Sequence, residues 1–482
     1  MVFNSLSFLI FFTVVFFIYY FLLKNNTKLQ NWLLLFSSYV FYGMADARMM
    51  PLLLAATIIF YFLGTAIQAG TKRTASLLNL LGILLGTGLL LYFKYLNFFL
   101  GSFSELFNSL GLKTNGGTFN IILPLGISFF TFRLLSYIIE IYRGKIQPIK
   151  DFVVFATYIA FFPTIISGPI DRPNNFIPQL ERLRTFNHYL ATDGCRQVLW
   201  GMFKKMVIAD NLAVFVNTVW ADIPHQSGST LIITAMLYAV EIYTDFSGYS
   251  DMAIGIGKIL GFRITQNFQY PFFSRNIAEY WRKWHMSLTS WVTDYIFMPL
   301  HVRFRNLGNA GLIIALIVNM IFVGIWHGAN WTFVIFGLYH GLLFVPLILS
   351  GFFFKNKKLK TTSLGLPTFS DALKMVTTFL LVALGFVVFR AESLSQVGQY
   401  FYFVFNRSGF FHLTNGLGNL VIIIPIIVLA FVLEWITRKE EYPLQITDHF
   451  KSRFYRIGFY WILITVIVLF SGDEQKFIYF QF

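Results

Sequence analysis

The chain has 482 residues, of which 56% are hydrophobic and only 12% are charged, and its mean hydropathy is +0.65. Soluble globular proteins carry about 25% charged residues, so this composition excludes a soluble protein and indicates an integral membrane protein. The net charge of +15 comes largely from short basic clusters between apolar runs, including 72–73, 143–150, 204–205 and 355–360. Such clusters are typical of cytoplasmic loops beside a lipid bilayer, so we expect no nucleic-acid partner.

Apolar runs that could form membrane helices follow one another along the whole chain. A membrane helix needs about 20 predominantly apolar residues. The candidate spans are 5–23, 30–45, 51–68, 76–99, 119–141, 152–168, 195–220, 229–248, 311–326, 331–350, 373–389, 417–436 and 456–471. Several are short or interrupted by Gly and Pro, so we expect about eleven crossings plus re-entrant or interfacial helices. The prediction is one all-α, polytopic membrane domain over residues 1–482.

The run 237–262 places polar side chains where a membrane helix is expected. Glu241 and Asp245 are four residues apart and share one helical face, and Ser247 and Asp251 share another. A carboxylate at membrane depth costs about 2.5–3.5 kcal/mol on the insertion scale, so these side chains should face a protein interior or a watery cavity. Two interpretations remain open. The residues form an internal hydrogen-bond network, or Asp245 and Ser247 line a substrate cavity.

The segment 279–300, EYWRKWHMSLTSWVTDYIFMPL, has the spacing of an amphipathic helix at the membrane surface. Glu279 and Lys283 are placed to form an i, i+4 pair. His285 follows close to the apolar face, where it is either an interfacial residue or an acid, base or positioning group near a membrane-embedded site. Four apolar residues fall on one face of this helix: Trp281, Trp284, Leu288 and Trp291.

The stretch GIWHGANWTF, residues 324–333, holds a histidine between two apolar runs. The preceding run, 311–326, would extend about 24 Å as a helix, which is shorter than the ~30 Å hydrocarbon core. Together with 331–350 it is too long for a single span, so the sequence predicts a break at 327–330. A broken helix at membrane depth is tolerated where it is buried in protein or lines a cavity. We therefore expect His327 at such a site, with Trp326 beside it.

This placement suggests a chemical role for His327. A desolvated imidazole stays neutral and can accept a proton from a hydroxyl group, although a hydrogen-bonded core histidine is the alternative. Asn330 is a candidate donor to a developing oxyanion. The single cysteine, Cys195, excludes an intrachain disulfide, and the eight histidines have no close ligand spacing. We therefore expect neither a metal site nor a bound cofactor.

Several stretches in register resemble the membrane-bound O-acyltransferase family, specifically its bacterial alginate O-acetyltransferase-like branch. The resemblance covers essentially the whole chain, and WRKWH and WHGANW are its most specific parts. The stretches are PLGISFFTFRLLSYIIEIYRG (124–144), FFPTIISGPIDRP (161–173), YTDFSGYSDMAIGIGKILGF (243–262), NFQYPFFSRNIAEYWRKWHMSLTSWVTDYIFMPL (267–300), GIWHGANWTF (324–333) and VVFRAESL (387–394).

The resemblance implies a fold, a reaction and a site. The fold would be a ring of tilted helices around a central tunnel, in the inner membrane of a bacterium. His327 matches the family's essential histidine and His285 its second characteristic histidine, and we assign Trp326 and Trp284 to the substrate-binding wall. The donor would be acetyl-CoA or an acylated carrier protein in the cytoplasm. The acyl group would pass to a separate periplasmic or extracellular SGNH-type O-acetyltransferase that modifies a polysaccharide.

The chain departs from the family pattern at a few positions. Arg133 stands where the family has Gln, Glu140 where it has Asp, and Thr164 where it has Gln. His301 and Val302 replace a frequent pair of glycines. These changes bear on the acceptor and on the surface that meets the donor, and they leave the histidines in place.

A second class of function shares part of this evidence. Intramembrane acids and a central cavity also suit a transporter of a polysaccharide, a lipid or an acyl group. Many transporters contain internal repeats, which this sequence lacks.

Overall fold

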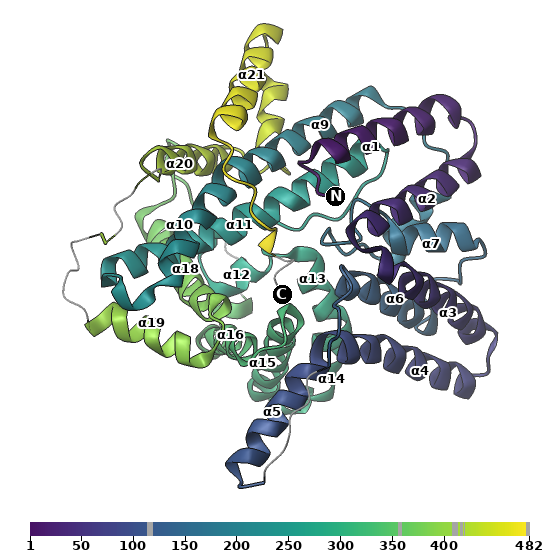
Figure 1. Cartoon of the computed structure of the whole chain (residues 1–482), viewed down its shortest axis with the longest axis horizontal. Coiled ribbons are helices and arrows are strands. Elements are labelled where there is room, and N and C mark those ends of the chain that lie inside the picture. Colours follow the sequence, from purple (N-terminus) through teal and green to yellow (C-terminus); the bar gives the residue numbers. More distant parts are fainter. Residues whose placement is uncertain (113–118, 355–358, 407–412, 415–417, 419, 479–482) are drawn as a thin grey trace. The chain divides into compact units, whose positions relative to one another are not determined.

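The computed structural model describes residues 1–112, 119–354, 359–406, 413–414, 418 and 420–478 (Figure 1). In these residues every regular element is a helix, apart from one isolated bridge between Thr361 and Pro367. The predicted all-α membrane protein is thus confirmed. The prediction of about eleven crossings and a central tunnel stays a prediction. Most of the predicted basic cluster at 355–360 lies outside the described residues. Six helical stretches of the described chain are long and apolar enough to cross a membrane: Thr27–Ala69, Lys72–Ser109, Arg305–His327, Trp331–Leu349, Phe369–Arg390 and Arg453–Phe470.

Contacts divide the chain into two compact units, residues 1–198 with 252–265, and residues 199–251 with 266–482. Two helices, α9 (His188–Met202) and α11 (Gly228–Ile259), contribute residues to both units. The prediction that residues 1–482 act as one acyltransferase domain stays a prediction.

The first unit contains the N-terminal helices. On α4, an added Cβ at Gly86 would lie 2.7 Å from Leu135 of α6, and one at Gly82 would overlap Ile138. Small residues thus let α4 approach α6 closely, as is usual between membrane helices. Figure 1 shows the two helices side by side. The elements are α1 (Leu6–Phe17), η1 (Ile18–Leu22), α2 (Thr27–Asp46), η2 (Ala47–Met49), α3 (Met50–Ala69), α4 (Lys72–Leu90), η3 (Leu91–Tyr95), α5 (Leu96–Ser109), α6 (Ile127–Tyr142), α7 (Phe152–Ala160) and α8 (Pro173–Leu180).

Arg133, one of the departures from the family pattern, has a structural role in the first unit. Its guanidinium is buried and donates hydrogen bonds to four carbonyl oxygens, those of Tyr158 (3.2 Å), Ile159 (3.1 Å), Thr164 (3.2 Å) and Pro169 (3.3 Å). It therefore satisfies carbonyl groups at the C-terminal end of α7 and in the non-helical segment that follows, where they would otherwise be buried without donors. Two departures, Arg133 and Thr164, thus contact each other.

The second unit contains every predicted site residue. Its elements besides the shared helices are η4 (Phe203–Ala209), α10 (Asp210–Ala221), η5 (Ile223–His225), η6 (Pro271–Phe273), α12 (Ile277–Trp281), α13 (Met286–Val292), η7 (Thr293–Phe297), α14 (Met298–Arg303), η8 (Arg305–Leu307), α15 (Gly308–His327), α16 (Trp331–Leu343), α17 (Val345–Leu349), η9 (Phe352–Phe354), α18 (Phe369–Arg390), α19 (Leu394–Asn406), α20 (Leu420–Ile436), η10 (Pro443–His449) and α21 (Arg453–Phe470).

The helices α15 and α16 form a closely packed hairpin in the second unit (Figure 1). An added Cβ at Gly324 would overlap the carbonyl oxygen of Phe333, and one at Gly337 would overlap that of Met320. The two helix backbones therefore touch through glycines, just before α15 ends at His327.

We expect Gly324→Ala to lower the thermal stability of the purified protein, because the methyl group has no room beside Phe333. Overpacking of this kind typically costs about 1–3 kcal/mol. The control is Gly88→Ala on α4, where an added Cβ meets nothing within 4 Å. Apparent Tm in detergent checks this prediction, and equal melting of the two variants would contradict it.

Candidate active site

The predicted helix break at 327–330 is confirmed. α15 ends at His327 and α16 begins at Trp331. Asn330 caps α16, since its Oδ1 accepts a hydrogen bond from Thr332 N at 3.1 Å, and its Nδ2 donates to Glu392 O at 2.7 Å. The amide oxygen and the amide nitrogen of Asn330 thus both stabilise the break. This geometry gives Asn330 a capping role, and its assignment to the oxyanion stays a prediction.

His327 lies in an aromatic shell at the end of α15. Only 5% of the residue is exposed. Its ring centroid is 4.9 Å from that of Trp326, 5.0 Å from that of Phe389 and 6.3 Å from that of Phe336. The imidazole is therefore held at the break by apolar rings from α15, α16 and α18.

His285 interrupts the surface segment, and here the sequence-based prediction of one continuous helix is wrong. α12 ends at Trp281 and α13 starts at Met286. Between them His285 has φ 45 and ψ 51, a left-handed conformation that few residues other than glycine adopt. A strained backbone of this kind persists when its surroundings enforce it, and it points to a functional position.

Asn267 enforces this conformation from outside the helix pair. Its carbonyl oxygen accepts a hydrogen bond from Met286 N at 2.8 Å, and its Oδ1 accepts from Ser287 Oγ at 2.6 Å. The Asn267 amide in turn donates to Ser250 Oγ of α11 at 3.1 Å. These contacts join residues 17 and 20 positions apart, so local periodicity could not reveal them.

The two histidines belong to one aromatic cluster in which Trp326 contacts both. The His285 ring lies 5.5 Å from Trp326 and 4.6 Å from Phe246, and the residue is fully buried. Burial lowers the pKa of His285 to about 3, so this imidazole is neutral at physiological pH. The structure thus brings together His285, Trp326 and His327, three of the predicted site residues.

Because the pKa of His285 falls from 6.5 to about 3 on folding, the unfolded chain binds more protons at this residue below pH 6.5. Its stabilising contribution is therefore complete above about pH 6.5 and is lost as the pH falls toward 3. We expect His285→Asn, which tolerates the left-handed backbone, to flatten this dependence by up to about 1.4 kcal/mol per pH unit. Unfolding in detergent between pH 4 and 8 checks it, and parallel curves for the two proteins would contradict it.

The tryptophans of the surface segment lie in the protein interior, which corrects the prediction that they face the membrane interface. Trp281, Trp284 and Trp291 are 6%, 2% and 3% exposed. Trp284 stacks on Tyr280 at 5.4 Å and meets Phe268 at 5.0 Å. The predicted Glu279–Lys283 pair is present at 3.1 Å. Aromatic spacing alone does not distinguish lipid from protein as the surroundings of a helical face.

Asp245 and Ser247 lie in a buried ionic network, which matches the first of their two interpretations. Lys205 Nζ is 2.8 Å from both Asp210 Oδ1 and Asp245 Oδ1. Lys204 Nζ is 2.6 Å from Asp251 Oδ2, and it donates to Ser247 Oγ at 2.8 Å. Buried charges need such partners. Substrate binding by Asp245 and Ser247 stays a prediction.

The same network corrects an expectation about Lys204 and Lys205. Both lysines are buried on the π-helical segment η4, so they do not form part of an exposed cytoplasmic loop. The network also reaches the C-terminal segment, because Lys205 Nζ donates to Gln475 O at 3.1 Å and Ile478 N donates to Asp245 Oδ2 at 2.8 Å.

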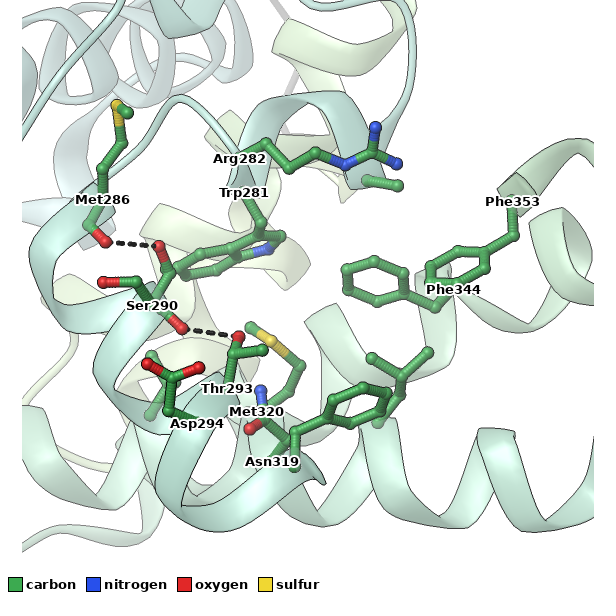
Figure 2. Close-up of a pocket in the computed structure, with 15 residues that line it drawn as sticks. Trp281, Arg282, Met286, Ser290, Thr293, Asp294, Asn319, Met320, Phe344 and Phe353 are labelled. Atoms are coloured by element: carbon green, nitrogen blue, oxygen red, sulfur yellow. Dashed lines mark hydrogen bonds between the residues drawn. The ribbon is translucent and has the colours of Figure 1, made fainter. Parts of the chain in front are cut away.

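A cavity of about 450 Å³ opens between the surface segment and the α15–α16 hairpin (Figure 2). One side is formed by α12, α13 and the π-helical segment η7, and the other by α15, by Phe344 directly after α16, and by Phe353 of η9. Its walls combine apolar rings with polar side chains, as ligand pockets commonly do. The polar residues that line it are Arg282, Thr289, Ser290, Thr293, Asp294 and Asn319.

Two other cavities are weaker candidates for a substrate-binding site. A groove of about 700 Å³ in the first unit is lined by 27–31, 146–154 and 173–181, and none of the predicted site residues borders it. A void of about 20 Å³ beside Lys205 and Asp245 is the size of a single water molecule. The 450 Å³ cavity is lined by α15, the helix that ends at His327.

Two buried polar residues of this region were not singled out from the sequence. Asn319 interrupts the apolar run of α15, and His340 lies on α16, where its Nδ1 accepts a hydrogen bond from Trp281 Nε1 at 3.3 Å. The sequence did hold a signal, since polar residues within membrane helices are costly and commonly functional.

The fold and the site together define a polytopic membrane protein with two buried histidines around one tryptophan. A family model for the membrane-bound O-acyltransferase family matches residues 147–364, which include both histidines. The probable alginate O-acetylase AlgI of Pseudomonas aeruginosa is 36% identical over 449 residues, covering 89% of this chain and 81% of that protein. The chain belongs to the membrane-bound O-acyltransferase family and is an O-acyltransferase.

Two further relatives are named for acyl transfer to other polymers. The peptidoglycan O-acetyltransferase of Helicobacter pylori is 32% identical, covering 76% of this chain and 71% of that protein. The teichoic acid D-alanyltransferase of Bacillus subtilis is 32% identical, covering 57% of this chain and 70% of that protein. The similarity to the alginate O-acetylase is the most extensive of the three, in line with the branch that the sequence motifs indicate.

Proposed function

We propose that this protein transfers an acetyl or another short acyl group from a cytoplasmic thioester to a hydroxyl group, for O-acylation of a polysaccharide outside the cytoplasm. The observation that carries the proposal is the position of His327, a buried imidazole at a helix break inside the membrane region. Packing alone does not require an ionisable residue there, because aromatic rings already fill its surroundings.

In the proposed reaction, His327 is the general base. The acceptor oxygen bonds to the thioester carbonyl carbon, and the bond between this carbon and sulfur breaks. The proton of the hydroxyl passes through His327 to the leaving thiolate, so the products are an ester and a free thiol. His285 positions the donor or assists the proton transfer, and Trp326, which contacts both imidazoles, keeps the two histidines in register.

The donor is acetyl-CoA or an acylated carrier protein, and the acceptor is an alginate-like exopolysaccharide or a cell-wall polymer. Support comes from the names of the relatives, which describe acyl transfer to alginate, peptidoglycan and teichoic acid. The cavity of about 450 Å³ is the proposed binding site for the donor chain. We further propose an SGNH-type O-acetyltransferase as a partner and the bacterial inner membrane as the location.

The experiment that tests this function follows a labelled acyl group. Proteoliposomes with the wild-type protein receive radiolabelled acetyl-CoA on one side and candidate polysaccharides on the other. Transfer of label to polymer, lipid or protein supports the proposal, and the labelled product identifies the acceptor class. Movement of an unmodified polysaccharide or lipid without any ester formation would instead support the transporter alternative.

A further inference from the structure

Asn319 is a polar residue in the wall of the 450 Å³ cavity, and the packing around it does not explain why a polar side chain is present there. It lies in the middle of α15, on the same helical face as Val323 and His327, which follow at i+4 and i+8. It lines the cavity and is only 8% exposed, and its Oδ1 has no hydrogen-bond partner among the described residues. A buried acceptor without a donor is unfavourable, so its presence calls for a ligand or another explanation.

The neighbouring hydroxyl groups already donate hydrogen bonds to backbone carbonyl oxygens of their own helical segment. Thr289 Oγ1 donates to Met286 O at 3.3 Å, and Thr293 Oγ1 donates to Thr289 O at 2.7 Å. Ser290 Oγ donates to Ser287 O at 3.0 Å. Figure 2 shows the first two of these bonds as dashed lines, with Asn319 beside Met320 at the edge of the cavity. The Asn319 amide oxygen is therefore available to accept a hydrogen bond from a molecule in the cavity.

The opposite wall of the cavity is fixed by a buried side-chain pair. Trp281 lines the cavity, and its indole N–H donates to Nδ1 of His340 at 3.3 Å. The His340 ring also packs on Phe336 at 4.6 Å, and Phe336 in turn contacts the His327 ring at 6.3 Å. A rigid apolar wall facing a single amide suits an extended chain that is largely apolar and carries occasional amide groups.

We propose that Asn319 accepts a hydrogen bond from an amide N–H of the donor chain, and that it thereby selects thioesters of the pantetheine type. This inference rests on the proposed function. The pantetheine arm of coenzyme A and that of an acyl carrier protein both contain two secondary amides, so the recognised chemistry is common to the two sources. A site built to hydrogen-bond a substrate group discriminates strongly against analogues that lack the group.

The test compares three acetyl donors that differ in amide content: S-acetylpantetheine with two amides, S-acetyl-N-acetylcysteamine with one, and S-ethyl thioacetate with none. We expect the wild type to prefer the amide-bearing donors. Asn319→Leu should lower kcat/KM for S-acetylpantetheine by about tenfold or more, and it should leave kcat/KM for S-ethyl thioacetate nearly unchanged. Equal losses with all three donors, or no loss, would overturn the inference. Acetyl-CoA and an acetylated carrier protein, assayed in parallel, identify the natural source of the arm.

Asn79→Leu is the matched control. Asn79 lies on α4, is 9% exposed, and its Oδ1 also has no hydrogen-bond partner among the described residues, but it borders none of the three cavities. We expect this variant to keep the wild-type donor preference, and a loss of preference equal to that of Asn319→Leu would also overturn the inference. Inactivity of the wild type with every thioester is a different result, because it would reject the proposed function itself.

A binding measurement keeps the inference testable if Asn319→Leu does not fold. Ser290 lines the cavity, and the single native cysteine, Cys195, can be replaced by serine. In a Cys195→Ser, Ser290→Cys protein, we expect S-acetylpantetheine to slow modification by a maleimide, whereas S-ethyl thioacetate at the same concentration should not. Identical labelling rates with the two compounds would contradict recognition of amide groups in this cavity.

Discussion

His327→Ala is expected to abolish acyl transfer while the protein stays folded in the membrane. Removal of a general base typically costs about 10²–10⁴ in rate. The loss should appear mainly in kcat, because His327 is proposed to act on the proton and not to anchor either substrate. The stability effect should be moderate, since the rings of Trp326 and Phe389 still cover the position. Transfer of label from acetyl-CoA, measured at matched expression, checks this prediction.

His301→Ala is the control for the loss of a histidine from the second unit. His301 is only partly buried on α14, and its ring stacks on Phe297 at 5.5 Å. It lies outside the cluster of His285, Trp326 and His327. The assignment of the base fails if His327→Ala retains wild-type activity, or if the two alanine variants lose activity equally.

Lys205→Met should produce the largest loss of stability among single substitutions in the ionic network. The lysine is paired with Asp210 and Asp245 at 2.8 Å each, and all three side chains are almost completely buried. Its removal leaves buried carboxylates without their cation, and breaking a buried pair in this way typically costs about 3–5 kcal/mol. The C-terminal segment should also become easier to digest with protease, because Lys205 and Asp245 hold Gln475 and Ile478.

A combined variant isolates the electrostatic cause. Adding Asp210→Asn and Asp245→Asn to Lys205→Met removes the uncompensated charges, and it should recover most of the lost stability. Lys28→Met, at an exposed position, serves as the neutral control. Thermal unfolding in detergent measures all of these proteins. If the triple variant is no more stable than Lys205→Met, the loss has a cause other than unpaired charge.

Loss of Lys205 should also reduce activity, because the ionic network is connected to His285 through packed aromatic rings. Phe477, next to Ile478, stacks on Tyr249 at 4.6 Å and lies 6.1 Å from Phe246. Phe246 in turn contacts the His285 ring at 4.6 Å. The network, the C-terminal segment and His285 thus form one packed region of the second unit, so reduced activity should accompany reduced stability in Lys205→Met.

The sequence by itself determined the class of protein and the break at His327. Composition is enough to require a membrane because too little polar surface is present. The break follows from length, since 311–326 and 331–350 together exceed one bilayer, and α15 and α16 end and begin as expected. The pair of Glu279 and Lys283 was also predictable because its partners are one helical turn apart.

Only the tertiary structure decided the conformation of His285, the partners of the lysines and the surroundings of Asn319. Asn267 breaks the predicted surface helix through bonds to Met286 and Ser287, and Lys205 meets Asp245 across 40 positions of sequence. Contacts between distant segments leave no periodic trace in either segment alone. The spacing of residues on one helix predicts which face they share, whereas the packing of the other helices decides whether that face meets lipid, protein or a cavity.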